Sequence, residues 1–319
     1  MFGELKKWAG FVRISHTLFA LPFALAAMLV AAREHRGWPG FRVFGLILLA
    51  MFCARTCAMA FNRIVDRDID ARNPRTANRH LPAGQITLAS AWCLCIATGI
   101  GLIVTAWFIN PICFYLSPIA VGLVCFYSLT KRFTSYTHVF LGIALALAPI
   151  GAWLAVRGNL GFTVMEAPMG ASSMGRMIAQ QGLTGLQPIV LATSVIFWLI
   201  GFDIIYALQD YEFDRRAGLH SIVVAWGPSN ALHAAFLSHL VMWGLLAVFG
   251  VLCGFKLAYY FGIVVILACL IMEHWLARRR KGDWIQNAFF RLNSLISVAF
   301  LAVTTIEVVF PDFRIAGNP

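Results

Sequence analysis

Asn62-Arg-Ile-Val-Asp66-Arg-Asp-Ile-Asp70 ends one long apolar run, and Tyr206-Ala-Leu-Gln-Asp210-Tyr-Glu-Phe-Asp214 ends another. Each segment places two carboxylates four residues apart, so a helix stacks both on one face, where they can share a cation. Acidic residues are scarce in this chain, 14 among 319, and seven of them lie within or beside these two segments. Because carboxylates beside a bilayer core are costly, both segments are predicted to be functional.

The overall composition is that of a polytopic membrane protein. Hydrophobic residues make up 60% of the chain and charged residues 12%, and the mean hydropathy is +0.78. A span needs roughly 20 apolar residues, and stretches of that length recur along the chain. They predict nine transmembrane helices, at about 14–32, 43–61, 87–109, 111–129, 137–156, 188–208, 229–254, 257–276 and 288–310. The runs are too long and too uniformly apolar for barrel strands, so the predicted fold class is an all-α bundle.

The two acidic segments are separated by four predicted helices, an even number, so both face the same side of the membrane. This spacing predicts one integral-membrane domain over residues 1–319, built from two parallel four-helix repeats around a central cavity. The repeats are expected at about 14–130 and 137–276, with the last helix, about 288–310, as an addition. The two acidic segments can then meet across the cavity.

Basic residues cluster in alternate loops, at Lys6 to Arg13, Arg63 to Arg79, Lys131-Arg132, Arg215-Arg216 and Arg278 to Lys281. The positive-inside rule therefore predicts a protein of the cell membrane whose N-terminus and active-site mouth are cytoplasmic. The net charge of +11 does not indicate a nucleic-acid partner, because these residues flank spans rather than form one soluble face. Membrane lipid and an anionic substrate are the favoured partners, and no obligate protein partner is evident.

Four carboxylates in one cavity repel one another unless cations neutralise them, and an oxygen-only ligand set suits Mg²⁺. We therefore predict Mg²⁺ as the cofactor. Basic residues beside the acidic segments could grip a diphosphate whose charge the metal also bridges. These are Arg63, Arg67, Arg72, Arg75, Arg79, Lys131 and Arg132. Since the surrounding bundle is rich in Phe, Trp, Met and Leu, the predicted substrate is a polyprenyl diphosphate.

At these residues the chain resembles the UbiA superfamily of intramembrane prenyltransferases. The first segment matches the family pattern N-x-x-x-D-x-x-x-D, and the second matches D-x-x-Y-A-x-x-D-x-x-x-D from Asp203 to Asp214. Tyr127-Ser-Leu-Thr-Lys131-Arg132 is similar to the basic segment after the family's fourth helix. The resemblance implies that Mg²⁺ draws charge from the diphosphate, the allylic carbon–oxygen bond ionises, and an electron-rich aromatic ring attacks the cation.

The resemblance also implies a role for particular residues. Asp203 lies seven residues before Asp210 on the same helix face and is a candidate for orienting the acceptor or taking the ring proton. The implied metal ligands, also counted as catalytic, are Asp66, Asp70, Asp210 and Asp214. The implied substrate-binding residues are Arg13, Asn62, Arg67, Arg79, Lys131, Arg132 and Tyr206.

Two segments, Val12-Arg13-Ile-Ser-His16-Thr-Leu-Phe-Ala-Leu-Pro22 and Gly201 to Asp214, are most similar to the 4-hydroxybenzoate polyprenyltransferase branch. Acceptors in that branch carry a carboxylate, which Arg13 or Arg132 would bind. The implied activity is transfer of a polyprenyl group to 4-hydroxybenzoate in ubiquinone-type quinone biosynthesis. A related subgroup is associated with menaquinone made through futalosine, where the acceptor is 1,4-dihydroxy-6-naphthoate, and both acceptors remain open.

A cation-coupled membrane transporter is the competing class, because intramembrane carboxylates also line cation pathways. The acidic residues, however, lie at one predicted mouth. A conduction path calls for charged residues deeper in several spans, and apart from Asp203 and Glu307 these are few.

The connection at residues 157–187 is longer than the resemblance implies and contains several Gly and Met residues. It is predicted to lie on the side opposite the active site. Two interpretations remain open, an interfacial amphipathic segment with a face at Met165 to Ile178, or an insertion without regular structure.

Overall fold

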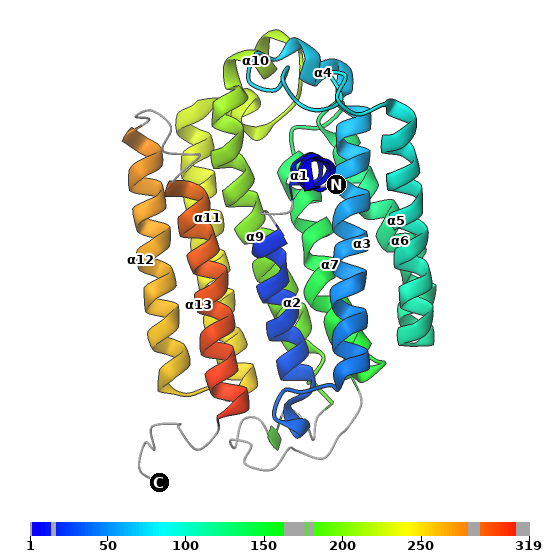
Figure 1. Ribbon diagram of the computed structural model, residues 1–319. Helices are drawn as coiled ribbons and strands as arrows, with labels where there is room; N and C mark the ends of the chain where they lie inside the picture. Colours follow the sequence, from blue (N-terminus) through cyan, green and yellow to red (C-terminus); the bar gives the residue numbers. More distant parts are fainter. Residues whose placement is uncertain (1, 14–16, 163–175, 178–181, 280–287, 311–319) are drawn as a thin grey trace.

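The computed structural model describes residues 2–13, 17–162, 176–177, 182–279 and 288–310 (Figure 1). All regular structure within these ranges is helical, and eight of the helices there are long and apolar enough to cross a membrane. They are α3 (Phe41–Val65), α5 (Leu88–Ile109), α6 (Pro111–Thr130), α7 (Thr137–Arg157), α9 (Leu186–Ala207), α11 (Ile222–Cys253), α12 (Leu257–Arg279) and α13 (Phe290–Val309). A ninth apolar helix, α2 (Thr17–Ala31), is shorter. The predicted all-α membrane bundle is confirmed.

Local sequence signals explain where several helices begin. Thr87, Asn110 and Ser221 precede α5, α6 and α11, and each side chain accepts a hydrogen bond from a backbone N–H of the first turn. Such caps satisfy N–H groups that have no partner within the helix. Helix α11 is divided at Gly227, whose φ of 78° and ψ of 158° are not helical, and Pro228 follows it. A short first part therefore precedes the long part, which begins near the predicted residue 229.

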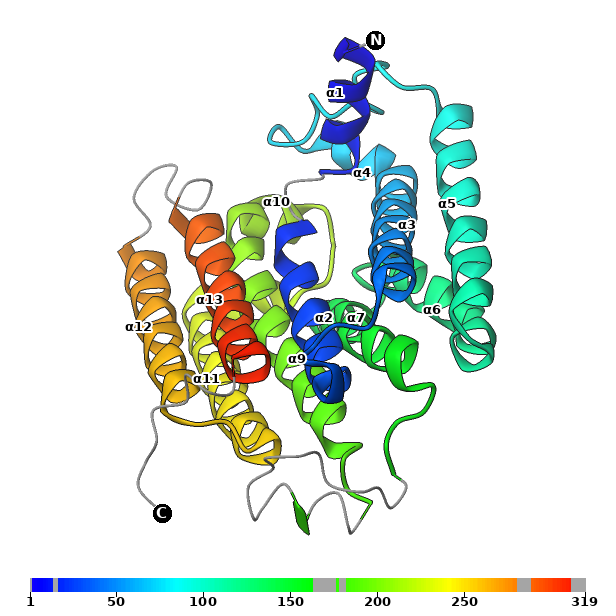
Figure 2. The ribbon, with the colours of Figure 1, turned by 60° about the horizontal axis from the view of Figure 1, so that its bottom comes forward.

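The spans form two groups that share α7 (Figures 1 and 2). Helices α3, α5 and α6 pack on one another, while α2, α7, α9, α11, α12 and α13 pack in a ring. The short helices α4 (Arg67–Arg72) and α10 (Tyr211–Arg216) follow α3 and α9, and both lie at the same end of the bundle (Figure 1). The N-terminal helix α1 (Phe2–Phe11) lies toward this end as well (Figure 1). The topology therefore brings the two acidic segments together.

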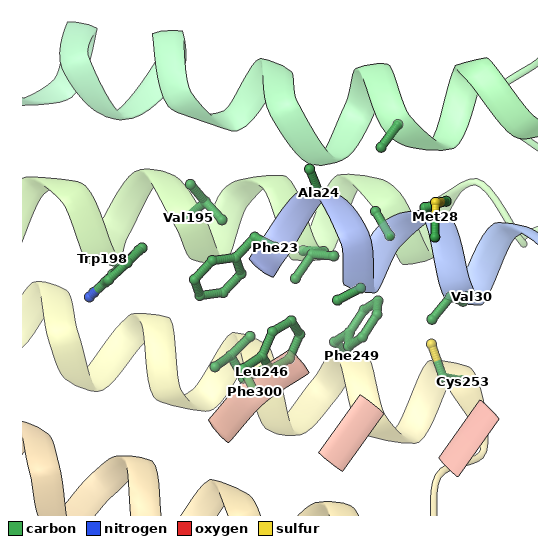
Figure 3. Close-up of a cluster of buried hydrophobic side chains, with 14 of the residues drawn as sticks. Phe23, Ala24, Met28, Val30, Val195, Trp198, Leu246, Phe249, Cys253 and Phe300 are labelled. Carbon is green, nitrogen blue, oxygen red and sulfur yellow. The ribbon is translucent and has the colours of Figure 1, made fainter. Parts of the chain in front are cut away.

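An aromatic core joins the helices of the ring (Figure 3). Phe23 of α2 lies 4.9 Å, between ring centroids, from both Trp198 of α9 and Phe300 of α13. Leu246 and Phe249 of α11 are buried in the same cluster. Inside a bilayer such packing stabilises through close van der Waals contact rather than through exclusion of water. The core fixes the position of α9, which carries the second acidic segment.

The end of α7 and the start of α9 lie at the end of the bundle opposite α4 and α10 (Figure 1). Gly185 donates its backbone N–H to the carbonyl of Gly161 at 3.0 Å, which joins the two described ends of this connection. Of the predicted Met165 to Ile178 face, all but Arg176 and Met177 lies outside the described residues.

Candidate active site

Both acidic segments interrupt their helix at the first aspartate. Asp66, between α3 and α4, has φ −90° and ψ 3°, and Asp210, at the end of the 3₁₀ turn η3 (Leu208–Asp210), has φ −101° and ψ 3°. Two helical hydrogen bonds remain in the first segment. The backbone N–H of Asp66 donates to the carbonyl of Asn62 at 3.0 Å, and that of Asp70 donates to the carbonyl of Asp66 at 2.7 Å. The expected single helix face is thus replaced by a long helix, a break and a short helix, and this arrangement occurs twice.

The carboxylates of both segments line one cavity of about 280 Å³. It is bounded by α3, α4 and the following loop on one side and by α9, α10 and the start of α11 on the other. The sequence-predicted residues that line it are Arg13, Asn62, Asp66, Asp70, Arg79, Lys131, Asp203, Tyr206, Asp210 and Asp214. The structure does not bring Arg67 there, because its guanidinium pairs with exposed Asp68, Nε to Oδ1 3.1 Å. The lining also omits Arg132.

Asp66 is buried among three donors from α3 and the loop after α6. Lys131 Nζ lies 3.0 Å from its Oδ2 and Arg132 Nη2 lies 3.1 Å from its Oδ1. The amide of Asn62 donates to the same carboxylate at 3.1 Å. Arg132 also donates to the backbone carbonyls of Ser128 and Val65, so it supports Asp66 from outside the cavity.

Asp70 is bound chiefly by Arg79, which comes from the loop after α4. Arg79 Nη1 donates to both carboxylate oxygens at 2.7 Å, and Arg63 Nη1 lies 3.8 Å from Oδ2. The Asp70 side chain is almost fully buried, so two cations hold its charge in a poorly solvated place.

Asp210 is bound by residues that follow the first acidic segment. Asn73 donates to Oδ1 at 2.9 Å and Arg75 Nε donates to Oδ1 at 2.8 Å, while Arg75 Nη2 donates to Oδ2. Arg75 Nη1 also donates to the hydroxyl of Tyr206 at 3.1 Å. Burial alone lowers the pKa of Arg75, but its hydrogen bonds to Asp210 raise that pKa overall, so the guanidinium stays charged.

Asp214 differs from these three carboxylates. No Lys or Arg nitrogen in the described ranges lies within 4.0 Å of its side chain, and no hydrogen bond to it occurs there. Near it, the backbone N–H of His220 donates to the carbonyl of Lys131 at 2.9 Å, which ties the start of α11 to the basic loop after α6. Asp214 therefore offers free oxygen ligands at the lining of the cavity.

The donor set of the cavity fits Mg²⁺ in type, since carboxylate oxygens are the ligands that this metal prefers. Within the described residues, no three His, Cys, Asp or Glu side chains lie close enough together to hold a metal. Arg75, Arg79 and Lys131 instead contact the carboxylates. Metal binding therefore requires these cations to move to another anion, and a diphosphate has the charge and geometry to accept them.

A second cavity, of about 260 Å³, lies deeper in the bundle among α3, α5, α6 and α7. Its lining is mostly Ala, Leu and Ile, and it shares Arg55, Tyr127 and Leu145 with the first cavity. Leu116 and Ile119, which also line it, are exposed on the outer surface of α6. The polar cavity thus continues into an apolar chamber that reaches the lipid-facing side of the bundle.

Sequence reasoning missed Arg55 and His138. The guanidinium of Arg55 lies where the two cavities meet, its Nε is buried, and no hydrogen bond or ion pair to it occurs among the described residues. The available signal was a single arginine inside a long apolar run, where a charge is costly. His138 Nδ1 lies 2.7 Å from Asp203 Oδ2, a contact between helices that the chain spacing does not reveal.

Three features together define a membrane prenyltransferase: the all-helical membrane fold, the paired aspartate segments, and the basic residues Arg75, Arg79 and Lys131 that contact the aspartates. The chain belongs to the UbiA prenyltransferase family, whose model matches residues 20–295. A 4-hydroxybenzoate octaprenyltransferase of Tolumonas auensis is 28% identical over 267 residues, 84% of this chain and 85% of that protein. One from Francisella tularensis is 24% identical over 310 residues, 97% of this chain and 98% of that protein. Family membership identifies this protein as an enzyme. It excludes the cation-coupled transporter, the class that intramembrane carboxylates could also indicate.

Solved structures share the fold. The apo structure of a UbiA homolog from Aeropyrum pernix K1 has a TM-score of 0.74 and 28% identity, covering 92% of this chain and 98% of that one. A UbiA homolog from Archaeoglobus fulgidus bound to GPP and Mg²⁺ has a TM-score of 0.68 and 22% identity, covering 95% and 99%. The fold of this chain is therefore the UbiA fold along nearly its whole length.

Proposed function

We propose that this enzyme transfers a polyprenyl group from a polyprenyl diphosphate to an aromatic acid, with 4-hydroxybenzoate as the acceptor, in ubiquinone-type quinone biosynthesis. The observation that carries the proposal is the single cavity in which carboxylates from both acidic segments meet a set of arginines and a lysine. The names of the relatives, 4-hydroxybenzoate octaprenyltransferases, support this acceptor.

The mouth of the cavity is the proposed diphosphate site. Asp66, Asp70, Asp210 and Asp214 would hold Mg²⁺ there. That a UbiA homolog with the same fold is bound to GPP and Mg²⁺ supports this choice of metal. The metal, when bound, supplies positive charge that stabilises the departing diphosphate. Arg75, Arg79 and Lys131 exchange their aspartate partners for diphosphate oxygens and add to that stabilisation in a poorly solvated cavity. The allylic carbon–oxygen bond then ionises toward these cations.

The deeper chamber is the proposed site of the prenyl chain. Its apolar lining suits a hydrocarbon and offers few groups that could react with an allylic cation. A volume of about 260 Å³ is small for a long polyprenyl chain, but the chamber reaches Leu116 and Ile119 on the outer face of α6. The distal part of a long chain can therefore extend into lipid, where its transfer from the chamber carries little cost.

Arg55 is the proposed anchor of the acceptor carboxylate. A guanidinium without an anionic partner inside a membrane bundle is costly, and a bound carboxylate removes that cost through paired hydrogen bonds. Its place at the meeting of the two cavities puts an acceptor beside the first carbon of a chain that runs from the mouth to the chamber. Arg13 lines the same cavity and is a second basic group within it. Either 4-hydroxybenzoate or 1,4-dihydroxy-6-naphthoate carries the carboxylate that this site requires.

We also infer that the cavity mouth faces the cytoplasm and that the chain is one domain of two four-helix repeats plus α13. The basic loops and helices around α1, α4 and α10 gather at one end of the bundle (Figure 1). The matched helix breaks at Asp66 and Asp210 support the repeat.

Product analysis tests the proposal. The purified protein in detergent receives Mg²⁺, a polyprenyl diphosphate, and either 4-hydroxybenzoate or 1,4-dihydroxy-6-naphthoate. Prenylated hydroxybenzoate is the expected product. Product from the naphthoate alone would move the enzyme to futalosine-route menaquinone biosynthesis, and product from neither would reject the aromatic acid acceptors.

A further inference from the structure

A buried polar network lies beside the candidate active site and takes no part in the proposed chemistry. The indole N–H of Trp198 on α9 donates to Oδ1 of Asn293 on α13 at 2.9 Å. The amide of Asn293 donates in turn to Oε2 of Glu273 on α12 at 3.1 Å and to the backbone carbonyl of Phe289 at 3.0 Å. Trp198, Asn293 and Glu273 are each 0% exposed. Because polar and ionisable groups enclosed in a membrane bundle are costly, the network indicates a function.

The backbone of Trp198 is held as well. Nε2 of His239 on α11 lies 3.2 Å from the carbonyl oxygen of Trp198, and since a carbonyl can only accept, Nε2 carries the proton. Nδ1 of His239 then accepts a hydrogen bond from Nε2 of His274 on α12, at 2.9 Å. Both imidazoles are buried, where hydrogen bonds are electrostatically stronger than in water. The side chain and the backbone of Trp198 are therefore each tied to another helix.

Aromatic packing holds the indole further. Its ring centroid lies 4.9 Å from that of Phe23, also drawn in Figure 3, and 6.3 Å from that of Phe202 in an edge-on arrangement. Trp198 nevertheless lines the polar cavity. A change of its rotamer would break a buried hydrogen bond and these ring contacts together. The indole is therefore a rigid part of the cavity wall.

Trp198 and Arg55 lie at similar depths on opposite sides of the cavity. Arg55 on α3 is 11 residues before Asp66, and Trp198 on α9 is 12 residues before Asp210. Both aspartates lie at the same end of the bundle (Figure 1). At about 1.5 Å per residue, each of the two deeper residues lies roughly 17 Å along its helix from its aspartate. An aromatic ring whose carboxylate binds Arg55 therefore has the indole as the wall across from it.

We propose that Trp198 determines which acceptor fits the cavity and that Asn293 is the positioning residue that holds the indole in place, a role that rests on the proposed function. A single aromatic ring fits between Arg55 and the indole, whereas a second fused ring meets the indole. Because the network holds the indole, it does not move aside for the larger acceptor, and that clash produces selectivity. The site therefore prefers 4-hydroxybenzoate to 1,4-dihydroxy-6-naphthoate.

The acceptor selectivity of the purified enzyme tests this role. It is the kcat/KM for 4-hydroxybenzoate divided by that for 1,4-dihydroxy-6-naphthoate, with Mg²⁺ and one polyprenyl diphosphate. Wild type should favour the hydroxybenzoate by about tenfold or more, and Trp198→Phe, with its smaller ring, should lower the ratio about tenfold through the KM for the naphthoate. The KM for the diphosphate should stay unchanged. Trp153→Phe is the matched control, because Trp153 is also buried, at 3% exposed, but lines neither cavity.

A double-variant comparison tests the positioning role of Asn293. Asn293→Leu releases the indole N–H and should lower the selectivity ratio of the wild-type enzyme. In the Trp198→Phe enzyme the same substitution should leave the ratio unchanged, because phenylalanine has no N–H for Asn293 to hold. A merely structural Asn293 would instead shift the ratio equally in both enzymes, which would overturn its assignment.

The wild-type enzyme alone can refute the proposal, so the test does not depend on whether a variant folds. Equal kcat/KM values for the two acceptors would overturn the selectivity assigned to the indole and leave the proposed prenyl transfer standing. The same holds for an unchanged ratio in Trp198→Phe, or for an equal shift in Trp153→Phe. Product from the naphthoate alone, or from neither acceptor, would overturn the proposed function and this inference with it.

Discussion

Arg75 donates from Nε to Oδ1 of Asp210 at 2.8 Å, although 135 residues separate the two in the chain. The arginine follows the first acidic segment and the aspartate begins the second, so this ion pair closes the two halves of the site on each other. It also keeps a proposed metal ligand covered by a cation. A diphosphate that binds Arg75 draws it away from Asp210. Asp210 can then bind a metal, so substrate binding and metal binding are linked.

Arg75→Ala tests this exchange. Removing the guanidinium should lower turnover by about 10²-fold, because a contact to the departing diphosphate is lost. In the absence of substrate the same variant should bind Mn²⁺ more tightly than wild type, since Asp210 no longer has a competing partner. Titration of Mn²⁺ followed by electron paramagnetic resonance measures the second effect. Unchanged Mn²⁺ affinity would show that Arg75 does not guard a metal ligand, and Arg67→Ala, outside the cavity, is the control.

Asp66→Asn and Asp210→Asn are expected to abolish detectable prenyl transfer. Each substitution removes the charge that a metal ligand supplies, while the amide keeps the size of the side chain. Membrane insertion and detergent extraction should stay at wild-type levels, because the bundle packs through its apolar helices. Asp68→Asn should retain full activity, since that side chain is 81% exposed and lies outside the cavity. Normal turnover in either variant would contradict a metal held by both acidic segments.

Arg55→Ala should weaken acceptor binding and leave diphosphate binding intact. A hydrogen bond to a charged group contributes about 1.5–3 kcal/mol, so the KM for the acceptor should rise by about tenfold to a hundredfold. The methyl ester of the acceptor provides the control, because it lacks the negative charge. Wild type should strongly prefer the free acid over the ester, whereas the variant should not distinguish them. A retained preference would place the carboxylate elsewhere, with Arg13 as the next residue to test.

Gly201→Ala and Gly122→Ala should change stability in opposite directions. A Cβ at Gly201 of α9 would clash with the ring of His239 on α11, which forces two packed helices apart at a cost of about 1–3 kcal/mol. A Cβ at Gly122 of α6 meets nothing within 4 Å, so alanine there should stabilise the helix by about 0.5–1 kcal/mol. Thermal unfolding in detergent measures both, and an equal melting temperature for the two variants would contradict this packing.

The membrane fold was predictable from the sequence because the apolar runs are long and their ends carry recognisable signals. The aspartates were predictable as a candidate site because charge is costly beside a bilayer core. The helix breaks at Asp66 and Asp210 were not, since both segments read as continuous helix and the conformation depends on tertiary contacts such as Lys131 with Asp66. The unequal placement of the basic residues was equally hidden. Arg67 and Arg79 are both arginines close to the first acidic segment. Only the path of the loop after α4 brings Arg79, and not Arg67, to the cavity.

Arg55 and His138 show the other limit of sequence reasoning. Arg55 lies inside the apolar helix α3 and His138 lies at the start of α7, and neither belongs to a recognisable motif. The pairing of His138 with Asp203 spans 65 residues and depends on how α7 packs against α9. Which acceptor the site prefers depends on the shape of the cavity between these groups.

The most direct test of the account is the binding of a polyprenyl thiolodiphosphate, whose carbon–sulfur bond resists ionisation, measured by calorimetry in Mg²⁺ and in EDTA. The account predicts saturable binding with Mg²⁺ and its loss in EDTA, because the aspartates repel a diphosphate unless the metal joins them. It also predicts that Asp210→Asn and Asp66→Asn each weaken binding, since one diphosphate contacts both segments through the metal. Equal affinity in Mg²⁺ and EDTA would contradict the central claim that the two acidic segments bind the substrate through a shared metal.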